Sequence, residues 1–63
     1  MPFVQIQMLE GRDDEKKRQL IVAVTNAICE TLAAPPESVR VVLTDVPKTH
    51  WGVGGKTMKE LGR

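Results

Sequence analysis

The sequence predicts an α/β (α+β) protein built from a single βαβ unit with a parallel strand pair, followed by a C-terminal hairpin arm. Three segments support this fold class: residues 2–9 alternate between apolar and polar side chains, residues 14–33 repeat apolar side chains at helical spacing, and residues 39–46 are β-branched and nearly all apolar. A strand, a long helix and a second strand in this order are typical of a parallel pair joined by a right-handed crossover.

The first predicted strand has a clear two-residue period. Val4, Ile6 and Met8 fall on one face. Because successive side chains of a strand point to opposite faces, this alternation predicts a β-strand. The opposite face carries two polar residues flanked by two apolar ones, which are Phe3, Gln5, Gln7 and Leu9.

The predicted helix has recognisable start and stop signals. Asp13 can cap its N-terminus, and Asp14 and Glu15 place negative charge in the first turn, where the helix dipole favours it. Pro35 and Pro36 end the helix because neither can donate a backbone hydrogen bond. The apolar stripe comprises Leu20, Ile21, Val24, Ala27, Ile28 and Leu32. The polar residues beside it, expected to remain in solvent, include Lys16, Lys17, Arg18, Asn26 and Glu30.

The second predicted strand and the segment after it differ in character. Residues 39–46 contain one long charged side chain, Arg40, in an otherwise mostly apolar run, so we expect this strand to be covered on both faces. After Pro47, residues 51–55 read Trp-Gly-Val-Gly-Gly, which favours a tight hairpin or arm with little core of its own. We expect this arm to dock on a neighbouring subunit.

Size indicates an oligomer. A chain of 63 residues makes one domain with a core near the lower limit of stability. Its only cysteine, Cys29, excludes an intrachain disulfide, and Cys29 with the only histidine, His50, is too few for a structural zinc site. Two strands and one helix also leave a sheet edge and a sheet face uncovered. Pairing of subunits edge to edge, with stacking of the pairs, would cover both.

Charge and hydropathy exclude other classes of partner. Nine basic and eight acidic residues give a net charge of +1, so no global field attracts nucleic acid or an anionic membrane. The apolar runs are only a few residues long, so we expect neither a signal peptide nor a membrane span. A lone thiol and no targeting segment together predict a cytoplasmic protein.

Pro2 is the first candidate for chemistry. A methionine before a small residue is normally removed, so we expect Met1 to be cleaved and Pro2 to carry a free secondary amine. This amine would lie at the start of the first strand, where it can act as a base. Taken alone, the same pattern more commonly marks an ordinary terminus that packs or frays.

Two arginines, a histidine and a tryptophan complete the candidates. Arg12 follows the first strand, which spans about 23 Å when extended, so only an antiparallel partner subunit can bring its Arg12 beside Pro2. Arg40 begins the second strand, at the same end as Pro2 in a parallel pair, and can serve its own subunit or a neighbour. Trp51 can line an apolar wall, and His50 is expected to be a surface residue of the loop.

Each of these residues also has a purely structural explanation. Arg12 precedes an acidic helix start and can form a surface pair with Asp14 or Glu15. Arg40 can equally form a structural ion pair or contact a ligand. Trp51 is more often a core or interface residue than a pocket wall. Cys29 lies next to the apolar stripe and is expected to be a small packing residue.

The candidate groups suit one class of reaction. A base and two guanidinium groups, with no recognisable nucleophile, metal-ligand or dinucleotide motif, favour abstraction of a proton next to a carbonyl of a carboxylate substrate. Return of the proton elsewhere on a conjugated chain is tautomerisation. Guanidinium groups and an apolar wall would both lower the pKa of a proline amine, because both disfavour its protonated form.

The motifs in their order and spacing resemble the 4-oxalocrotonate tautomerase family over the whole chain. These motifs are Pro2, the Leu9-Glu10-Gly11-Arg12 turn followed by Asp14-Glu15, the Pro36-x-Ser38-Val39-Arg40-Val41 strand entry, and the aromatic-Gly-x-Gly-Gly segment of residues 51–55. The resemblance implies a single tautomerase-like domain over residues 1–63. It also implies a homohexamer, a trimer of βαβ dimers, that needs no cofactor.

The resemblance further implies the role of each site residue. Pro2 would be the general base for enol–keto tautomerisation of an unsaturated 2-hydroxy dicarboxylate such as 2-hydroxymuconate, an intermediate of aromatic compound catabolism. Arg12 of one neighbour would hold the distal carboxylate, and Arg40 of another would polarise the 2-oxygen and its carboxylate. The backbone near Leu9 would order the substrate, and Trp51 would line the pocket.

The sequence departs from the family pattern at one position and leaves two alternatives. The family prototype has phenylalanine where Trp51 stands, so the indole can narrow the site or change substrate choice. Dehalogenases and hydratases of the same superfamily are the weaker enzyme alternative, because residues 51–55 contain no acid and Leu9 replaces an arginine of those relatives. A non-catalytic module that binds organic anions through Arg12 and Arg40 is the other alternative.

Overall fold

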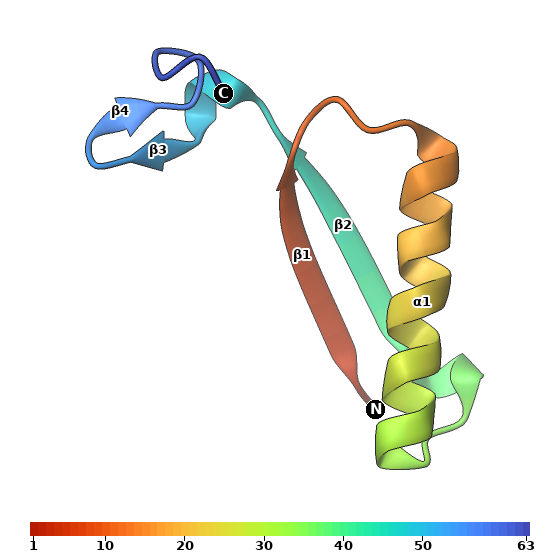
Figure 1. Ribbon diagram of the computed structural model, residues 1–63. Helices are drawn as coiled ribbons and strands as arrows, with labels where there is room; N and C mark the ends of the chain where they lie inside the picture. Colours follow the sequence, from red (N-terminus) through yellow and green to blue (C-terminus); the bar gives the residue numbers. More distant parts are fainter.

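A parallel pair of strands and one long helix form the body of the molecule. The computed structural model describes residues 1–63, with strand β1 spanning Phe3–Leu9 and strand β2 spanning Arg40–Val46. The two strands are in parallel register from Phe3↔Arg40 to Leu9↔Val46, and helix α1 (Asp14–Leu32) connects them (Figure 1). The predicted βαβ unit with a parallel pair is therefore confirmed.

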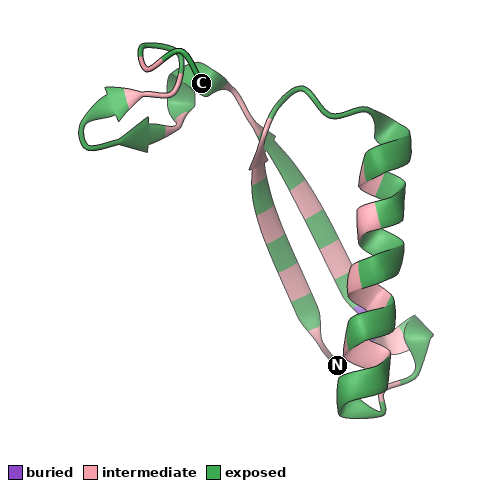
Figure 2. Ribbon diagram, in the orientation of Figure 1, coloured by how far each residue is buried: buried purple, intermediate pink, exposed green.

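The alternation of β1 sorts its side chains between two environments. Val4, Ile6 and Met8 are half-buried on the face that α1 covers, whereas Phe3 and the two glutamines of the strand are exposed (Figure 2). The strand β2 repeats the pattern, with Val41 half-buried and its neighbours on the other face exposed. The sheet therefore has one covered face and one bare face.

Local signals define both ends of α1. The side chain of Asp13 accepts a hydrogen bond from the backbone N–H of Lys16 at 2.8 Å, as expected of an N-terminal cap. At the other end Ala33 adopts a left-handed conformation with φ 54°, and the two prolines follow. Pro36 begins a short 3₁₀ helix, η1 (Pro36–Ser38), that leads into β2.

Lys17 corrects one expectation for the helix surface. Its ammonium group binds the carboxylate of Asp45 on β2 at 2.5 Å, and its side chain is only 23% exposed. The hydrogen bond from this ammonium to Asp45 raises the pKa of Lys17. Lys17 was expected to be free in solvent because its partner lies 28 residues away and is brought beside it only by packing of α1 on β2.

The C-terminal segment forms the predicted arm. After a 3₁₀ turn, η2 (Lys48–His50), strand β3 (Gly52–Val53) pairs antiparallel with β4 (Lys56–Thr57). Gly54 and Gly55 connect them with φ values of 62° and 84°, and two consecutive left-handed residues are typical of a type I′ turn. Figure 1 shows the hairpin projecting away from the βαβ body.

The chain has almost no interior of its own. Only Val39 is buried, with 9% of its surface exposed, and the radius of gyration is 14.7 Å, against about 11 Å for a compact domain of this length. Phe3 is 60% exposed and Val42 is 42% exposed on the bare face of the sheet. The sequence predicted that β2 would be covered on both faces. Within one chain only one of its faces is covered. No helix has the length and apolar character needed to cross a membrane.

Candidate functional site

Pro2 and Arg40 lie together where the two strands begin. The backbone N–H of Arg40 donates a hydrogen bond to the carbonyl of Pro2 at 3.0 Å, which continues the parallel ladder by one residue. Pro2 is half-buried, whereas Met1 before it is 86% exposed. The parallel register thus brings these two candidates to the same end, as the strand order predicted.

The guanidinium group of Arg40 is held by a backbone carbonyl. Its Nη1 atom donates to the carbonyl oxygen of Glu37 in η1 at 2.6 Å, and it forms no ion pair. Of the two roles considered for Arg40, a structural ion pair and a ligand contact, the ion pair is absent within the chain. Since an arginine side chain has five N–H donors, most of those of Arg40 are free to bind an acceptor from outside the chain.

Arg12 lies at the opposite end of β1, beside the last residue of the strand. Its Nη1 atom donates to the carbonyl oxygen of Leu9 at 3.2 Å. The expected surface pair of Arg12 with Asp14 or Glu15 was wrong, because neither carboxylate contacts it. Instead, the Leu9 carbonyl and the Arg12 guanidinium form one small group at the turn.

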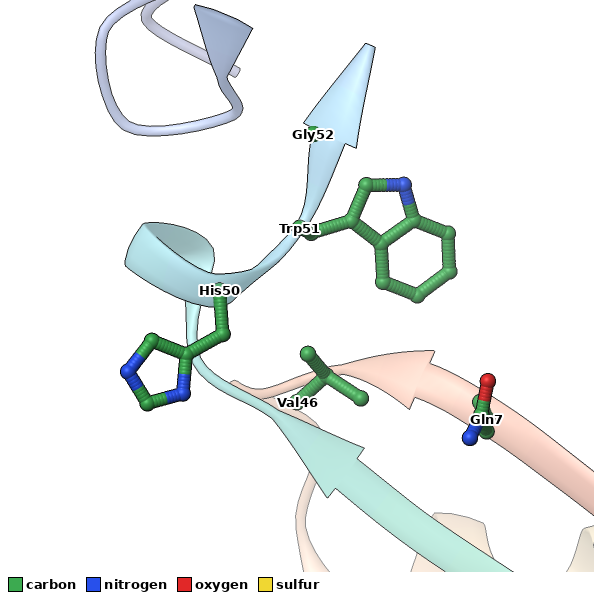
Figure 3. A pocket seen from close by; sticks show the side chains of 5 residues that line it. All are labelled: Gln7, Val46, His50, Trp51 and Gly52. Atoms are coloured by element: carbon green, nitrogen blue, oxygen red, sulfur yellow. The ribbon is translucent and has the colours of Figure 1, made fainter. Parts of the chain in front are cut away.

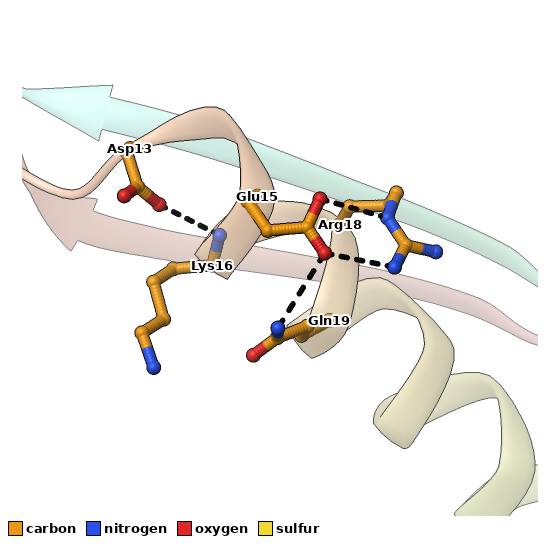
Figure 4. Close-up of polar contacts among 5 residues, drawn as sticks. All are labelled: Asp13, Glu15, Lys16, Arg18 and Gln19. Atoms are coloured by element: carbon orange, nitrogen blue, oxygen red, sulfur yellow. Dashed lines mark hydrogen bonds and ion pairs between the residues drawn. The ribbon is translucent and has the colours of Figure 1, made fainter.

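Glu15 has a closer partner within the helix (Figure 4). Arg18, one turn further on, donates two hydrogen bonds to it at 2.8 and 3.1 Å, and Gln19 donates a third at 3.5 Å. The hydrogen bonds from Arg18 lower the pKa of the Glu15 carboxyl. Residues three apart on a helix face one another, so Arg18 satisfies Glu15 and leaves Arg12 without a carboxylate partner.

Trp51 lines a pocket at the base of the arm. The pocket has a volume of about 220 Å³ and is also lined by Gln7, Val46, His50 and Gly52 (Figure 3). Trp51 is half-buried, whereas the exposed His50 ring borders the pocket from the other side of Val46 in this view. Trp51 is thus a pocket wall in the isolated chain, although a core or interface role was the more common expectation.

Gln7 is a pocket residue that sequence reasoning missed. It was assigned only to the polar face of the first strand. The two-residue period could nevertheless have indicated Gln7 as a site residue, because residues 7 and 9 share a face of β1 and Leu9 was already a candidate. What the alternation could not show is that the Trp51 side chain, at the base of the arm, lines the same pocket as Gln7.

A second hollow lies between β1 and α1 on the covered face of the sheet. It has a volume of about 340 Å³ and is lined by Met8, Arg12, Lys16 and Leu20. Lys16 and Leu20 are four residues apart and so lie on one side of α1, whereas Arg12 reaches the hollow from the turn before the helix. The guanidinium of Arg12 therefore borders an apolar hollow with a second cation nearby.

The two groups of candidates do not meet within one chain. Pro2 and Arg40 mark the start of the sheet, whereas Leu9, Arg12 and Trp51 lie at its other end. Seven strand residues at about 3.3 Å each separate them by about 23 Å. No cluster of three or more histidine, cysteine, aspartate or glutamate side chains forms a possible metal site.

These features define a class of protein: a short α/β chain with a proline and an arginine at one end of a parallel sheet, and an arginine and an aromatic arm at the other. A family model described as "Tautomerase enzyme" matches residues 2–61 of the chain. The chain therefore belongs to the tautomerase family, and it is an isomerase.

Known proteins of similar sequence and structure agree with this assignment. The 2-hydroxymuconate tautomerase of Comamonas testosteroni is 54% identical over 63 residues, which is all of both chains. A 4-oxalocrotonate tautomerase isozyme from Methylibium petroleiphilum superposes with a TM-score of 0.93 at 53% identity, covering 98% of this chain and 100% of that one. A heterohexamer 4-oxalocrotonate tautomerase from Chloroflexus aurantiacus gives a TM-score of 0.91 at 43% identity, covering 97% and 98%.

Proposed function

We propose that the protein catalyses enol–keto tautomerisation of an unsaturated 2-hydroxy dicarboxylate such as 2-hydroxymuconate, with the Pro2 amine as general base. The observation that carries this proposal is the position of Pro2 and Arg40 at the same end of the sheet, where the Arg40 backbone N–H bonds the Pro2 carbonyl and most N–H donors of the Arg40 guanidinium have no partner within the chain. Full-length similarity to a 2-hydroxymuconate tautomerase supports the choice of substrate. We place the enzyme in aromatic compound catabolism in the cytoplasm.

The active form is proposed to be a homohexamer, a trimer of dimers. If two chains pair antiparallel along the free edge of β1, the Arg12 of each chain comes close to the Pro2 of the other, which closes the 23 Å gap within one chain. Stacking of such dimers through the bare sheet face would bury Phe3 and Val42, which are exposed in the single chain. Arg40 and the Trp51 arm could then serve neighbouring chains.

The first step requires the removal of Met1. While Met1 is attached, the Pro2 nitrogen is part of an amide and has no basic lone pair. Met1, the residue to be removed, is 86% exposed. Removal leaves a secondary amine whose pKa nearby guanidinium groups and an apolar wall would lower, so that more of it is unprotonated at neutral pH.

The proton transfer itself then needs only this amine. The amine takes the proton of the 2-hydroxyl group, the O–H electron pair forms the C2 carbonyl, and the conjugated double bonds shift along the chain. The protonated amine returns the same proton to the carbon at which negative charge accumulates. Arg40 would bind the 2-oxygen and its carboxylate, Arg12 the distal carboxylate, with the Leu9 backbone and Trp51 positioning the chain.

The test combines intact mass with an ultraviolet assay of 2-hydroxymuconate ketonisation. Protein shown by mass to lack Met1 should convert the dienol, and Pro2→Ala should lose most of this activity. Arg12→Ala should mainly raise KM, whereas Arg18→Ala, a matched change at an arginine that only pairs with Glu15, should leave both constants unchanged.

Two results would reject the mechanism. If Met1-free, assembled protein converts neither this nor related enols, or if Pro2→Ala is as active as the unaltered protein, Pro2 is not the base. Binding of dicarboxylates that survives Pro2→Ala without turnover would then favour the organic-anion-binding module.

A further inference from the structure

The pocket beside Trp51 contains polar groups that no protein partner satisfies. The amide of Gln7, the indole N–H of Trp51 and the imidazole of His50 form no side-chain hydrogen bond within the chain. They surround a hollow of about 220 Å³ with an apolar floor at Val46. A pocket of this size fits one end of a small ligand, and it offers both hydrogen-bond donors and an apolar surface.

Gln7 occupies a defined place in this pocket. It lies two residues before Leu9 on the same face of β1, and Val46, the floor of the pocket, is the register partner of Leu9 on β2. Figure 3 shows Gln7 and Trp51 on the same side of Val46. A substrate chain that lies against the indole and reaches the Leu9 turn would therefore pass the Gln7 amide.

The chemistry of an amide decides what it can recognise. Its NH₂ group donates to a carboxylate or carbonyl oxygen without adding charge, and its own oxygen can accept from a hydroxyl group. In the single chain Arg12 borders the separate hollow on the covered face of the sheet, so Gln7 would reach the carboxylate from the bare face. A hydrogen bond from the amide N–H to a carboxylate contributes more than one between neutral groups.

We infer that Gln7 is a further substrate-binding residue, whose side-chain amide donates to the distal carboxylate of the substrate at the Trp51 end of the site. This inference rests on the proposed tautomerase function and extends it to a residue outside the motifs of the sequence. Gln7 would thus contribute to the preference for dicarboxylates over acids that have no second carboxylate.

Binding can be measured without catalysis. Trp51 is the only tryptophan and the chain has no tyrosine, so intrinsic fluorescence reports on this pocket alone. Adipate, a saturated six-carbon dicarboxylate that cannot tautomerise, serves as the titrant on Met1-free, assembled protein. Gln7→Leu should raise the Kd for adipate about tenfold, which corresponds to the loss of one hydrogen bond to a charged group. Gln19→Leu, at an exposed glutamine of α1 outside the pocket and away from the bare sheet face, should change it less than about twofold.

Kinetics give a second readout. For 2-hydroxymuconate, Gln7→Leu should raise KM about tenfold and leave kcat within about twofold, because the distal carboxylate is bound alike in ground and transition states. For 2-hydroxypenta-2,4-dienoate, which lacks that carboxylate, neither constant should change. Gln7→Glu should weaken dicarboxylate binding more than Gln7→Leu. Glutamate has nearly the shape of glutamine, but its negative charge repels the substrate carboxylate.

The outcomes separate this inference from the proposed function. If Pro2→Ala abolishes turnover but Gln7→Leu and Gln7→Glu bind and turn over dicarboxylates like the unaltered protein, the assignment of Gln7 is wrong and the tautomerase function stands. If both Gln7 variants lose the assembled size in sedimentation, Gln7 is an interface residue and the assignment is also wrong. If adipate binding depends on Gln7 but no enol is converted, the site binds dicarboxylates and the proposed reaction is wrong.

Discussion

Replacement of Phe3 by alanine tests whether the bare sheet face is an assembly surface. A phenylalanine side chain has about 200 Å² of surface, and Phe3 is 60% exposed in the single chain, so stacking would bury about 120 Å². At about 25 cal/mol per Å² this contributes about 3 kcal/mol per chain. Because alanine keeps one methyl group, the net loss should be about 2 kcal/mol per chain, or about a thirtyfold weaker association.

Sedimentation equilibrium over a dilution series measures this change directly. The Phe3→Ala protein should dissociate at markedly higher concentration than the unaltered protein, and its melting temperature should depend more steeply on concentration, because folding and association are linked. Glu30→Ala, at an exposed residue of α1, is the control and should leave the assembly unchanged. An unchanged dissociation midpoint for Phe3→Ala would show that this face is not buried in the assembly, and the stacking argument would be refuted.

Three further predictions concern local structure. Asp13→Ala removes the N-terminal cap of α1 and should lower the free energy of unfolding by about 1 kcal/mol, measured by chemical denaturation; no loss would mean that solvent replaces the cap. The bond to Asp45 raises the pKa of Lys17 above its ordinary value of 10.5, so its stabilisation is complete below that pH and is lost as pH rises through the folded-state pKa. Lys17→Met should therefore remove this alkaline loss from thermal melts, and an identical profile would contradict the pairing. Gly55→Val, at φ 84°, should strain the β3–β4 turn and blue-shift or red-shift Trp51 fluorescence, whereas an unchanged spectrum would show that the arm tolerates the substitution.

The fold was largely predictable because its signals are local. The two-residue period of residues 3–9, the Asp13 cap and the paired glycines of the arm each depend on neighbours a few positions away. Such patterns determine which element forms and which face it buries. The order of strand, helix and strand then restricts the connection to a right-handed parallel crossover, as the structure has it.

The side-chain partners were less predictable. Arg12 lies within reach of two acidic residues in the sequence, yet the helix geometry gives Glu15 to Arg18 and leaves Arg12 on the Leu9 carbonyl. Lys17 was expected in solvent because Asp45 is distant along the chain. These contacts depend on how whole elements pack, which no local pattern encodes.

The sequence by itself therefore determined the element order, the faces of the strands and the family motifs that select Pro2 and the two arginines. Only the tertiary structure decided that the Arg40 guanidinium is held by the Glu37 carbonyl, that Trp51 and Gln7 line one pocket, and that a single buried residue is all the interior one chain provides. The physical reason is that periodicity and capping act over a few residues, whereas burial and pocket formation require segments far apart in the sequence to meet.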